Sequence, residues 1–141
     1  MSEFSITSDD FEEGQEIPKK FGYKHGNEQP KIDIHNFPVG TKCLALIMDD
    51  PDAMAAVGKV WVHWLATTNP AGELFNEGKN DFGERGYGGP APPDKRHTYI
   101  FKVYALDDIP DVGDGYSKQE LEDAMKGHIL AEAKLTGTYA P

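Results

Sequence analysis

The sequence has little cysteine, little positive charge and no long apolar run. Its single cysteine, Cys43, has no partner for an internal disulfide, and its apolar neighbours in "KCLALIM" predict a buried thiol. No apolar run approaches the about 20 residues that a membrane-spanning helix needs. No basic and apolar leader precedes the first predicted strand, so we expect a cytoplasmic protein without a membrane span.

Positive charge is scarce because 14 Lys and Arg residues face 24 Asp and Glu residues, which gives the 141-residue chain a formal net charge of -10. A surface this acidic repels phosphate backbones and anionic lipids, and this argues against nucleic-acid binding. Any anion that the protein binds must therefore be held by local donors, against the field of the whole molecule.

The residues that are present favour a mainly β protein. Apolar residues make up 38% of the chain, enough for a packed core, and the 15 glycines and 10 prolines cluster between the apolar runs. Short strands joined by turns have this pattern, whereas a helix bundle does not. The two longest polar or glycine- and proline-rich stretches, residues 11–30 and 71–96, are predicted to be mostly loop. The length fits a single domain over residues 1–141.

Apolar patterning predicts six strands. The strand at 42–50 is apolar on both faces, so it is predicted to be central. Alternation within the next strand places His63 on one face with Leu65, and Val62 on the other face with Trp64. The predicted strands cover residues 4–8, 31–37, 42–50, 59–70, 96–108 and 129–141.

One helix is predicted near residues 117–126. Ser117 and Glu120 have the spacing of a capping box, and Leu121 and Met125 belong to an apolar stripe at helical spacing. This helix is expected to pack on the periphery of the strands.

Five polar side chains stand out because they interrupt the apolar strands or follow them directly. Asp50 and Asp52 flank a proline at the end of a strand, where carboxylates commonly accept backbone N–H bonds of the turn. His63 lies in an apolar strand, where a histidine is most often a core residue bonded to a carbonyl. His97 and Tyr99 share one face of a later strand. Their convergence beside glycine- and proline-rich loops favours a shared pocket for a small oxyanion, in which an aspartate favours protonation of the histidines.

Several motifs in order carry a resemblance to a known family. They are "FEEGQEIPKKF", "DPDA", "WVHWL", "NDFGERGYGGPAPP", "RHTYIFKVYALD" and "AMKGHILAEAKLTGTY". The sequence resembles the phosphatidylethanolamine-binding protein family, in its short bacterial and archaeal branch, over nearly the whole chain. The resemblance implies an antiparallel β-sandwich with one or two peripheral helices and a small anion pocket at one end.

The resemblance also implies the ligand and the residues that bind it. The expected ligand is a small anion, such as phosphate or a phosphorylethanolamine-like head group, with no cofactor and no metal. A homodimer is expected, and because some eukaryotic members bind kinases, a regulated protein partner is a further expectation. The ligand-binding residues implied by the family are Asp50, Asp52, His63, Pro92, His97 and Tyr99.

Two positions depart from the family pattern near the predicted pocket. Met54 stands where a proline usually follows "DPDA", and Thr98 stands where an arginine is common. We predict a trans peptide bond before Met54, because a cis bond to a non-proline residue costs about 3 kcal/mol. Met54 is then expected to shift the pocket edge and to present its thioether to the ligand.

Three functions are compatible with these residues. The donor-rich set favours a small-anion binding module, with no catalytic residue. The alternative is a hydrolytic or metal-dependent enzyme that uses His63, His97 and Asp50 as general acid and base or as metal ligands. Against it, no serine or cysteine nucleophile lies in a recognisable motif and the histidine spacing matches no metal motif. The third is a protein-binding module whose pocket has lost its function.

Overall fold

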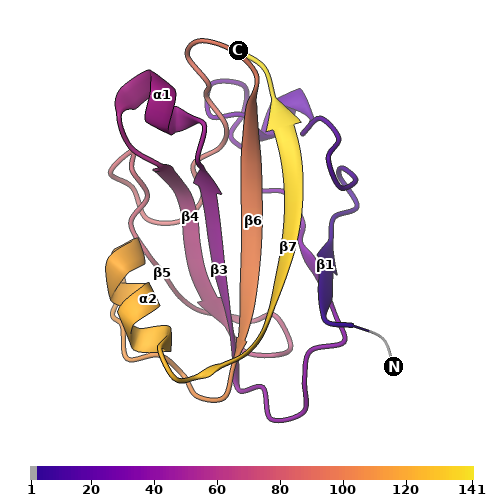
Figure 1. Ribbon diagram of the computed structural model, residues 1–141, viewed down its shortest axis with the longest axis vertical. Coiled ribbons are helices and arrows are strands. Elements are labelled where there is room, and N and C mark those ends of the chain that lie inside the picture. The colour runs from indigo at the N-terminus through magenta and orange to yellow at the C-terminus, as the bar shows by residue number, and fades with distance from the viewer. Residues whose placement is uncertain (1–2) are drawn as a thin grey trace.

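The computed structural model describes residues 3–141, and antiparallel strands dominate it (Figure 1). Five strands form one sheet in the order β5-β4-β3-β6-β7, and two short strands, β1 and β2, form a ribbon beside it. The predicted antiparallel β architecture with one or two peripheral helices is confirmed. The strands are β1 (Ser5–Thr7), β2 (Asp33–His35), β3 (Cys43–Asp50), β4 (Trp61–Thr68), β5 (Leu74–Glu77), β6 (His97–Leu106) and β7 (Ile129–Tyr139), and the helices are α1 (Ala53–Val57), α2 (Lys118–Met125) and the 3-10 turn η1 (Lys19–Phe21).

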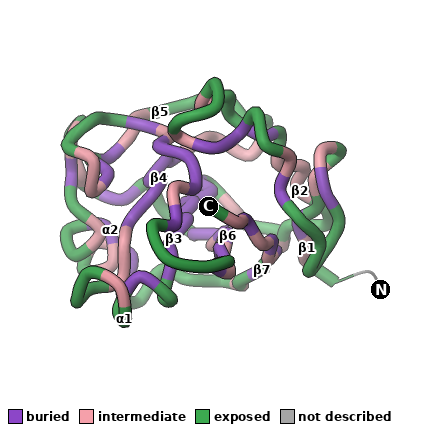
Figure 2. The backbone as a smooth tube through the Cα atoms, turned by 90° about the horizontal axis from the view of Figure 1, so that it is seen from above, coloured by how far each residue is buried: buried purple, intermediate pink, exposed green. Residues whose placement is uncertain are grey.

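Apolar side chains pack on both faces of the five-stranded sheet, so the core has two parts. All eight residues of β3 are buried, which confirms the prediction that this strand is central. One face packs against the ribbon and the N-terminal loops, and the other packs against α2. Cys43 lies fully buried on the α2 side, and this burial raises the pKa of its thiol to about 11. Seen from the end of the molecule, β3, β4 and β6 run through the buried centre (Figure 2).

Helix α2 begins where the sequence predicts. Ser117 Oγ accepts a hydrogen bond from the backbone N–H of Glu120, and a Glu120 carboxylate oxygen accepts one from the N–H of Ser117, which completes the capping box. Leu121 and Met125 are buried against the sheet. The capped end and the apolar stripe together fix the position of the helix on this face.

A β-bulge at His63 breaks the alternation of β4. Trp64 pairs with Met48 and Val62 pairs with the residue after Met48, so His63 has no partner residue on β3. His63 and Trp64 consequently lie on one face of the sheet, while Val62 and Leu65 lie on the other. The prediction that His63 shares a face with Leu65 is wrong, because a bulge inserts one residue into an otherwise regular period of two.

The segment that follows β1 returns to the last strand. The N–H of Gly14 donates to the carbonyl of Thr136, the N–H of Ile17 donates to the carbonyl of Thr138, and the N–H of Thr138 donates to the carbonyl of Gln15. These bonds tie the beginning of the described chain to the outer side of β7, the strand that ends it.

Two elements differ from the sequence-based expectation. Residues 53–57, between the predicted strands 42–50 and 59–70 where no helix is predicted, form one turn of helix. Three alanines and a methionine favour helix there, and Gly58 ends it with a left-handed backbone at φ 80°. The predicted loop 71–96 contains the short strand β5. The Ala53–Met54 peptide bond is trans, as predicted. No helix among residues 3–141 is long and apolar enough to cross a membrane.

Candidate functional site

A cavity of about 200 Å³ lies at one end of the five-stranded sheet, where β3 ends, α1 follows, and β4 and β6 begin. Four of the six predicted residues line it, namely Asp50, His63, His97 and Tyr99. They come from three neighbouring strands and share one face, since the bulge in β4 turns His63 toward Tyr99 with their rings 5.1 Å apart. Apolar residues of α1 and of the loop between β5 and β6 form the remaining walls.

His97 is held between two carboxylates. Its Nδ1 lies 2.6 Å from Asp50 Oδ2, and its Nε2 lies 2.7 Å from Asp94 Oδ1. Burial opposes protonation of this ring, but the hydrogen bonds and charges of Asp50 and Asp94 outweigh it and raise the pKa of His97. With both N–H groups donating to carboxylates, His97 is an imidazolium whose charge is already compensated.

His63 is in the opposite protonation state. Burial lowers the pKa of this imidazole, and the carbonyl of Gly88 and the charge of Asp50 offset burial only in part. Nδ1 lies 2.7 Å from the Gly88 carbonyl oxygen, so the neutral ring carries its proton on Nδ1. Nε2 is therefore the nitrogen available to a ligand, and in the neutral ring it is an acceptor.

Two donors at the cavity have no hydrogen-bond partner in the described protein. They are the hydroxyl of Tyr99 and the indole N–H of Trp61, and both atoms are buried. Burial and the nearby charge of Asp50 raise the pKa of Tyr99, so its hydroxyl keeps its proton. Two unpaired donors thus lie buried in the walls of the cavity, beside a histidine acceptor.

The other predicted residues take supporting positions. Asp52 does not line the cavity, because its carboxylate accepts a hydrogen bond from the N–H of Thr98 at 2.8 Å. That bond joins the turn after β3 to β6, and Asp50 Oδ1 in turn accepts from the N–H of Asp52 at 3.0 Å. Pro92 is buried, but its neighbours Ala91 and Pro93 form the wall.

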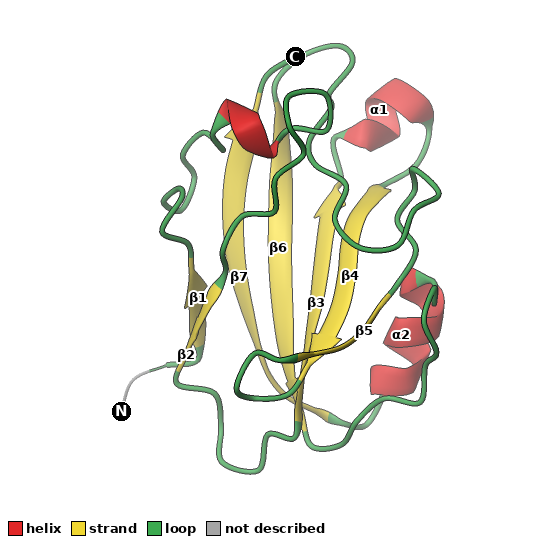
Figure 3. Ribbon diagram, turned by 180° about the vertical axis from the view of Figure 1, so that it is seen from behind, coloured by secondary structure: helices red, strands yellow, loops and turns green. Residues whose placement is uncertain are grey.

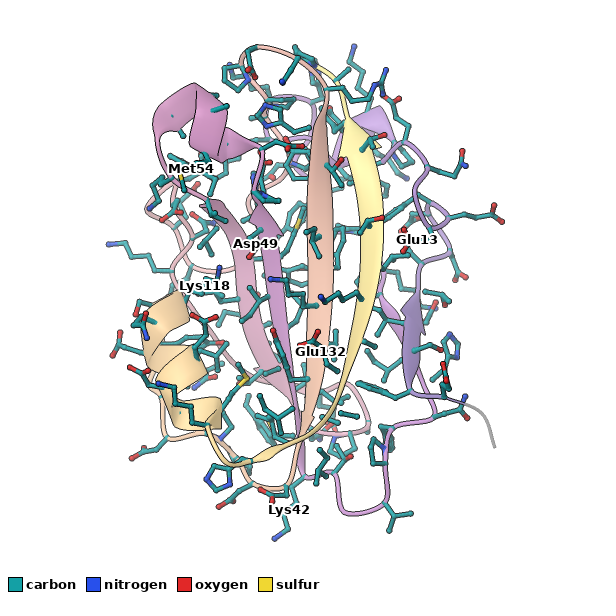
Figure 4. All side chains as sticks on the ribbon, viewed as in Figure 1. Glu13, Lys42, Asp49, Met54, Lys118 and Glu132 are labelled. Carbon is teal, nitrogen blue, oxygen red and sulfur yellow. The ribbon has the colours of Figure 1, made fainter. Side chains whose placement is uncertain are left out.

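Met54 does not present its thioether to the cavity, contrary to the expectation. It lies on the outer side of α1 and is 54% exposed, while Ala53, Ala56 and Val57 form the inner side (Figure 4). The helical turn explains the difference, since residues three and four apart share a face and Met54 lies between them.

Asp49 belongs to the same acidic run as Asp50 but points to the opposite face of β3 (Figure 4). Its buried carboxylate lies 2.9 Å from Lys118 Nζ and 3.4 Å from Lys102 Nζ. This pairing anchors the first turn of α2 to the sheet. Asp49 therefore has a structural role, whereas its neighbour Asp50 faces the cavity.

Three residues of the site escaped the sequence analysis. Asp94 precedes His97 by three residues in a proline-rich loop, and that spacing was the available signal. Trp61 precedes His63 by two residues in the same strand, which also indicated a shared face. Phe82 packs edge-on against His63 at 5.6 Å, but nothing in the glycine-rich loop singled it out.

His97 is not placed to act as a metal ligand or as a general base. Both ring nitrogens of His97 donate to carboxylates, so neither has a lone pair free for a metal or for accepting a proton. Among residues 3–141, no group of three or more His, Cys, Asp or Glu side chains is placed to hold a metal ion. The residues that line the cavity include no serine, threonine or cysteine nucleophile.

The fold and the cavity together define a class of protein: a small, mainly antiparallel β protein with an Asp, His and Tyr cavity at the end of its sheet. The family model described as phosphatidylethanolamine-binding protein matches residues 7–140. The chain belongs to the phosphatidylethanolamine-binding protein family, in the bacterial and archaeal branch of UPF0098 proteins.

Relatives and solved structures agree with this membership. A UPF0098 protein of Chlamydia muridarum is 40% identical, covering 95% of this chain and 97% of its own. One from Methanothermobacter thermautotrophicus is also 40% identical, with 92% and 93% covered. The crystal structure of Chlamydia trachomatis CT736 superposes with a TM-score of 0.87 at 35% identity and covers 99% of this chain and 98% of its own. Escherichia coli YbcL, described as a member of the mammalian PEBP family, superposes with a TM-score of 0.86 at 29% identity and 98% coverage of both chains.

Proposed function

We propose that the cavity binds a small oxyanion, such as phosphate or a phosphorylated head group, and that one proton is taken up with it. The observation that carries this proposal is the pair of buried, unpaired donors, the Tyr99 hydroxyl and the Trp61 indole N–H. An unpaired buried donor costs about 1–3 kcal/mol. Ligand oxygen atoms that accept hydrogen bonds from these two donors would remove this free-energy cost. The cavity walls must shift for the oxygen atoms to reach the donors.

The proton follows from the charges around the cavity. The charge of His97 is compensated by Asp50 and Asp94, and His63 is neutral, so the described residues that line the cavity offer an anion no uncompensated positive charge. An oxyanion next to Nε2 of His63 would meet a lone pair. Binding becomes favourable when His63 is protonated there, or when the ligand donates its own O–H to Nε2.

The ligand class is supported by the family and by the size of the cavity. The family is described as binding phosphatidylethanolamine, whose head group is a phosphate ester. The cavity, at about 200 Å³, has room for a head group and not for acyl chains. Its apolar walls suit the carbon atoms of an esterified phosphate.

Calorimetric titration with sulfate and with inorganic phosphate between pH 5.5 and 8 tests this proposal. Sulfate carries no proton in this range, so the proton must come to His63, and repeating the titration in buffers of different ionisation heat measures proton uptake directly. We expect uptake that approaches one proton and an affinity that falls as the pH rises. Binding without proton uptake would refute the mechanism.

Two histidine variants make the test specific. His63→Gln should abolish the proton uptake and weaken sulfate binding at least tenfold. His25→Gln is the matched control, because His25 is exposed and does not line the cavity, and this variant should bind sulfate as the parent does. If His63→Gln binds sulfate as tightly as the parent, the cavity is not the anion site.

A further inference from the structure

A second and larger cavity lies on the same face of the sheet, at the opposite end from the anion cavity. It is a groove of about 370 Å³. Leu44, Leu46 and Ala66 of the sheet form its floor, and residues 29–34 and β5 form its walls. Figure 3 looks onto this face, with β2 on one side and β5 on the other. The floor is apolar, so a ligand that fills the groove must offer apolar surface.

The groove contains one carboxylate that no cation neutralises. Glu77, at the end of β5, lines the groove, and its Oε2 accepts a hydrogen bond from the indole N–H of Trp64 at 3.2 Å. Among residues 3–141, no Lys, Arg or His side chain forms an ion pair with Glu77. The Glu77 side chain can therefore accept further hydrogen bonds from a ligand in the groove.

The positive charge at the rim of the groove is neutralised by neighbouring carboxylates. Lys31 also borders the groove, but its Nζ lies between two carboxylates, 3.6 Å from Asp9 and 3.5 Å from Asp33. The local field is therefore negative, in agreement with the formal net charge of -10 of the whole chain. An anionic or fatty-acid-like ligand would be repelled, whereas a cation would be attracted.

We propose that this groove binds a small organic cation with an apolar body, such as an arylalkylammonium ion. The ammonium group forms a charge-assisted hydrogen bond with Glu77. The hydrocarbon part covers the apolar floor. This site is separate from the anion cavity, and the proposal goes beyond the function proposed for that cavity.

The two tryptophans give each cavity its own reporter. The Trp64 indole N–H lies at the groove, and the Trp61 indole N–H lies at the anion cavity. Titration with phenethylammonium chloride at pH 7, followed by the two indole N–H signals in ¹H–¹⁵N spectra, should shift the Trp64 signal saturably. 2-Phenylethanol should bind at least tenfold more weakly, and 3-phenylpropionate should leave the signal unchanged. Equal affinity for the ammonium and the alcohol would overturn the proposal without any variant.

Glu77→Gln isolates the charge, because the amide oxygen still accepts the hydrogen bond from Trp64. This variant should bind phenethylammonium no better than 2-phenylethanol; unchanged ammonium affinity would overturn the proposal. His63→Gln is the matched control, which should keep ammonium binding and lose sulfate binding. If dilution of the ligand-free protein moves the Trp64 signal and Leu74→Glu abolishes that effect, a second copy of the chain covers the groove and the cation site is refuted.

Discussion

His63 and Trp64 are adjacent in the sequence, yet they point from one face of β4 into two different cavities. His63 lines the anion cavity and Trp64 lines the apolar groove. In a regular strand, neighbouring residues face opposite sides of the sheet. The bulge in β4 removes that restriction, and so one strand serves both cavities from the same face.

The two buried histidines should make stability depend on pH in opposite directions. The pKa of His97 is raised by Asp50 and Asp94 against the effect of burial, so its stabilising contribution is complete below about pH 6.5 and is lost as the pH rises through its folded pKa. The pKa of His63 is lowered by burial, so folding loses stability as the pH falls below about 6.5.

Chemical denaturation of two variants between pH 5 and 9 separates these effects. His97→Gln should be destabilised most at low pH, and the difference from the parent should shrink as the pH rises. His63→Gln should gain stability relative to the parent as the pH falls. If the stability of the two variants relative to the parent changes with pH in the same way, His63 and His97 do not have opposite protonation states.

Tyr99→Phe should separate binding from stability. The hydroxyl that it removes is buried without a partner in the described protein, so the free energy of unfolding should stay unchanged or rise by up to about 3 kcal/mol. Phosphate binding should weaken by about 1.5–3 kcal/mol, the range for a hydrogen bond to a charged group. Tyr116→Phe is the matched control, because its buried hydroxyl is also unpaired but lies on the α2 side of the sheet. Calorimetry and thermal unfolding of both variants decide the point.

Gly89→Ala should destabilise the loop that carries Ala91 and Pro93 to the wall of the anion cavity. A Cβ at this position would overlap the backbone carbonyl of Phe21, which cannot move far because it also accepts a hydrogen bond from the Tyr87 hydroxyl. We expect a loss of about 1–3 kcal/mol in the free energy of unfolding. Gly113→Ala, where a Cβ meets nothing within 4 Å, should be neutral or slightly stabilising. Equal effects of the two substitutions in urea denaturation would contradict the close packing of this loop.

Lys118→Met should destabilise the protein by about 1–3 kcal/mol, because it removes the nearer cation from the buried carboxylate of Asp49. Lys126→Met breaks an exposed pair with Asp123 at the other end of α2 and should cost less than about 0.5 kcal/mol. Urea denaturation at pH 7 measures both. A Lys118→Met protein as stable as the Lys126→Met protein would show that the buried carboxylate needs only Lys102.

Local patterns in the sequence predict much of this fold. The apolar run of β3 predicts a strand buried on both faces, and Ser117 with Glu120 predicts the start of α2. Strand alternation correctly puts His97 and Tyr99 on one face, and the end of β3 places Asp50 beside them. These features depend on neighbours in the sequence, so a single sequence is enough to find them.

The features that the sequence does not predict depend on distant contacts. The bulge at His63 leaves no trace in a period of two, because the residues on either side of His63 are apolar and suit either face of a sheet that is buried on both faces. The protonation state of His63 depends on its burial and on the carbonyl of Gly88, which comes from a loop whose course is set by tertiary packing. The shape of the groove depends on how the β1–β2 ribbon and β5 pack against the rest of the sheet.

The hydrogen bonds between residues 14–17 and β7 affect whether the protein can associate with other copies of itself. β7 is the last strand of the sheet, and an outermost strand with free N–H and C=O groups is a template for strand addition by another chain. Residues 14–17 form hydrogen bonds with the backbone groups of Thr136 and Thr138. Along the preceding part of β7, the charged side chains of Glu132 and Lys134 disfavour strand addition. The N-terminal segment therefore protects the edge of β7 from pairing with a strand of another molecule. Cleavage of the chain after Ile17 would expose this edge and permit polymerisation.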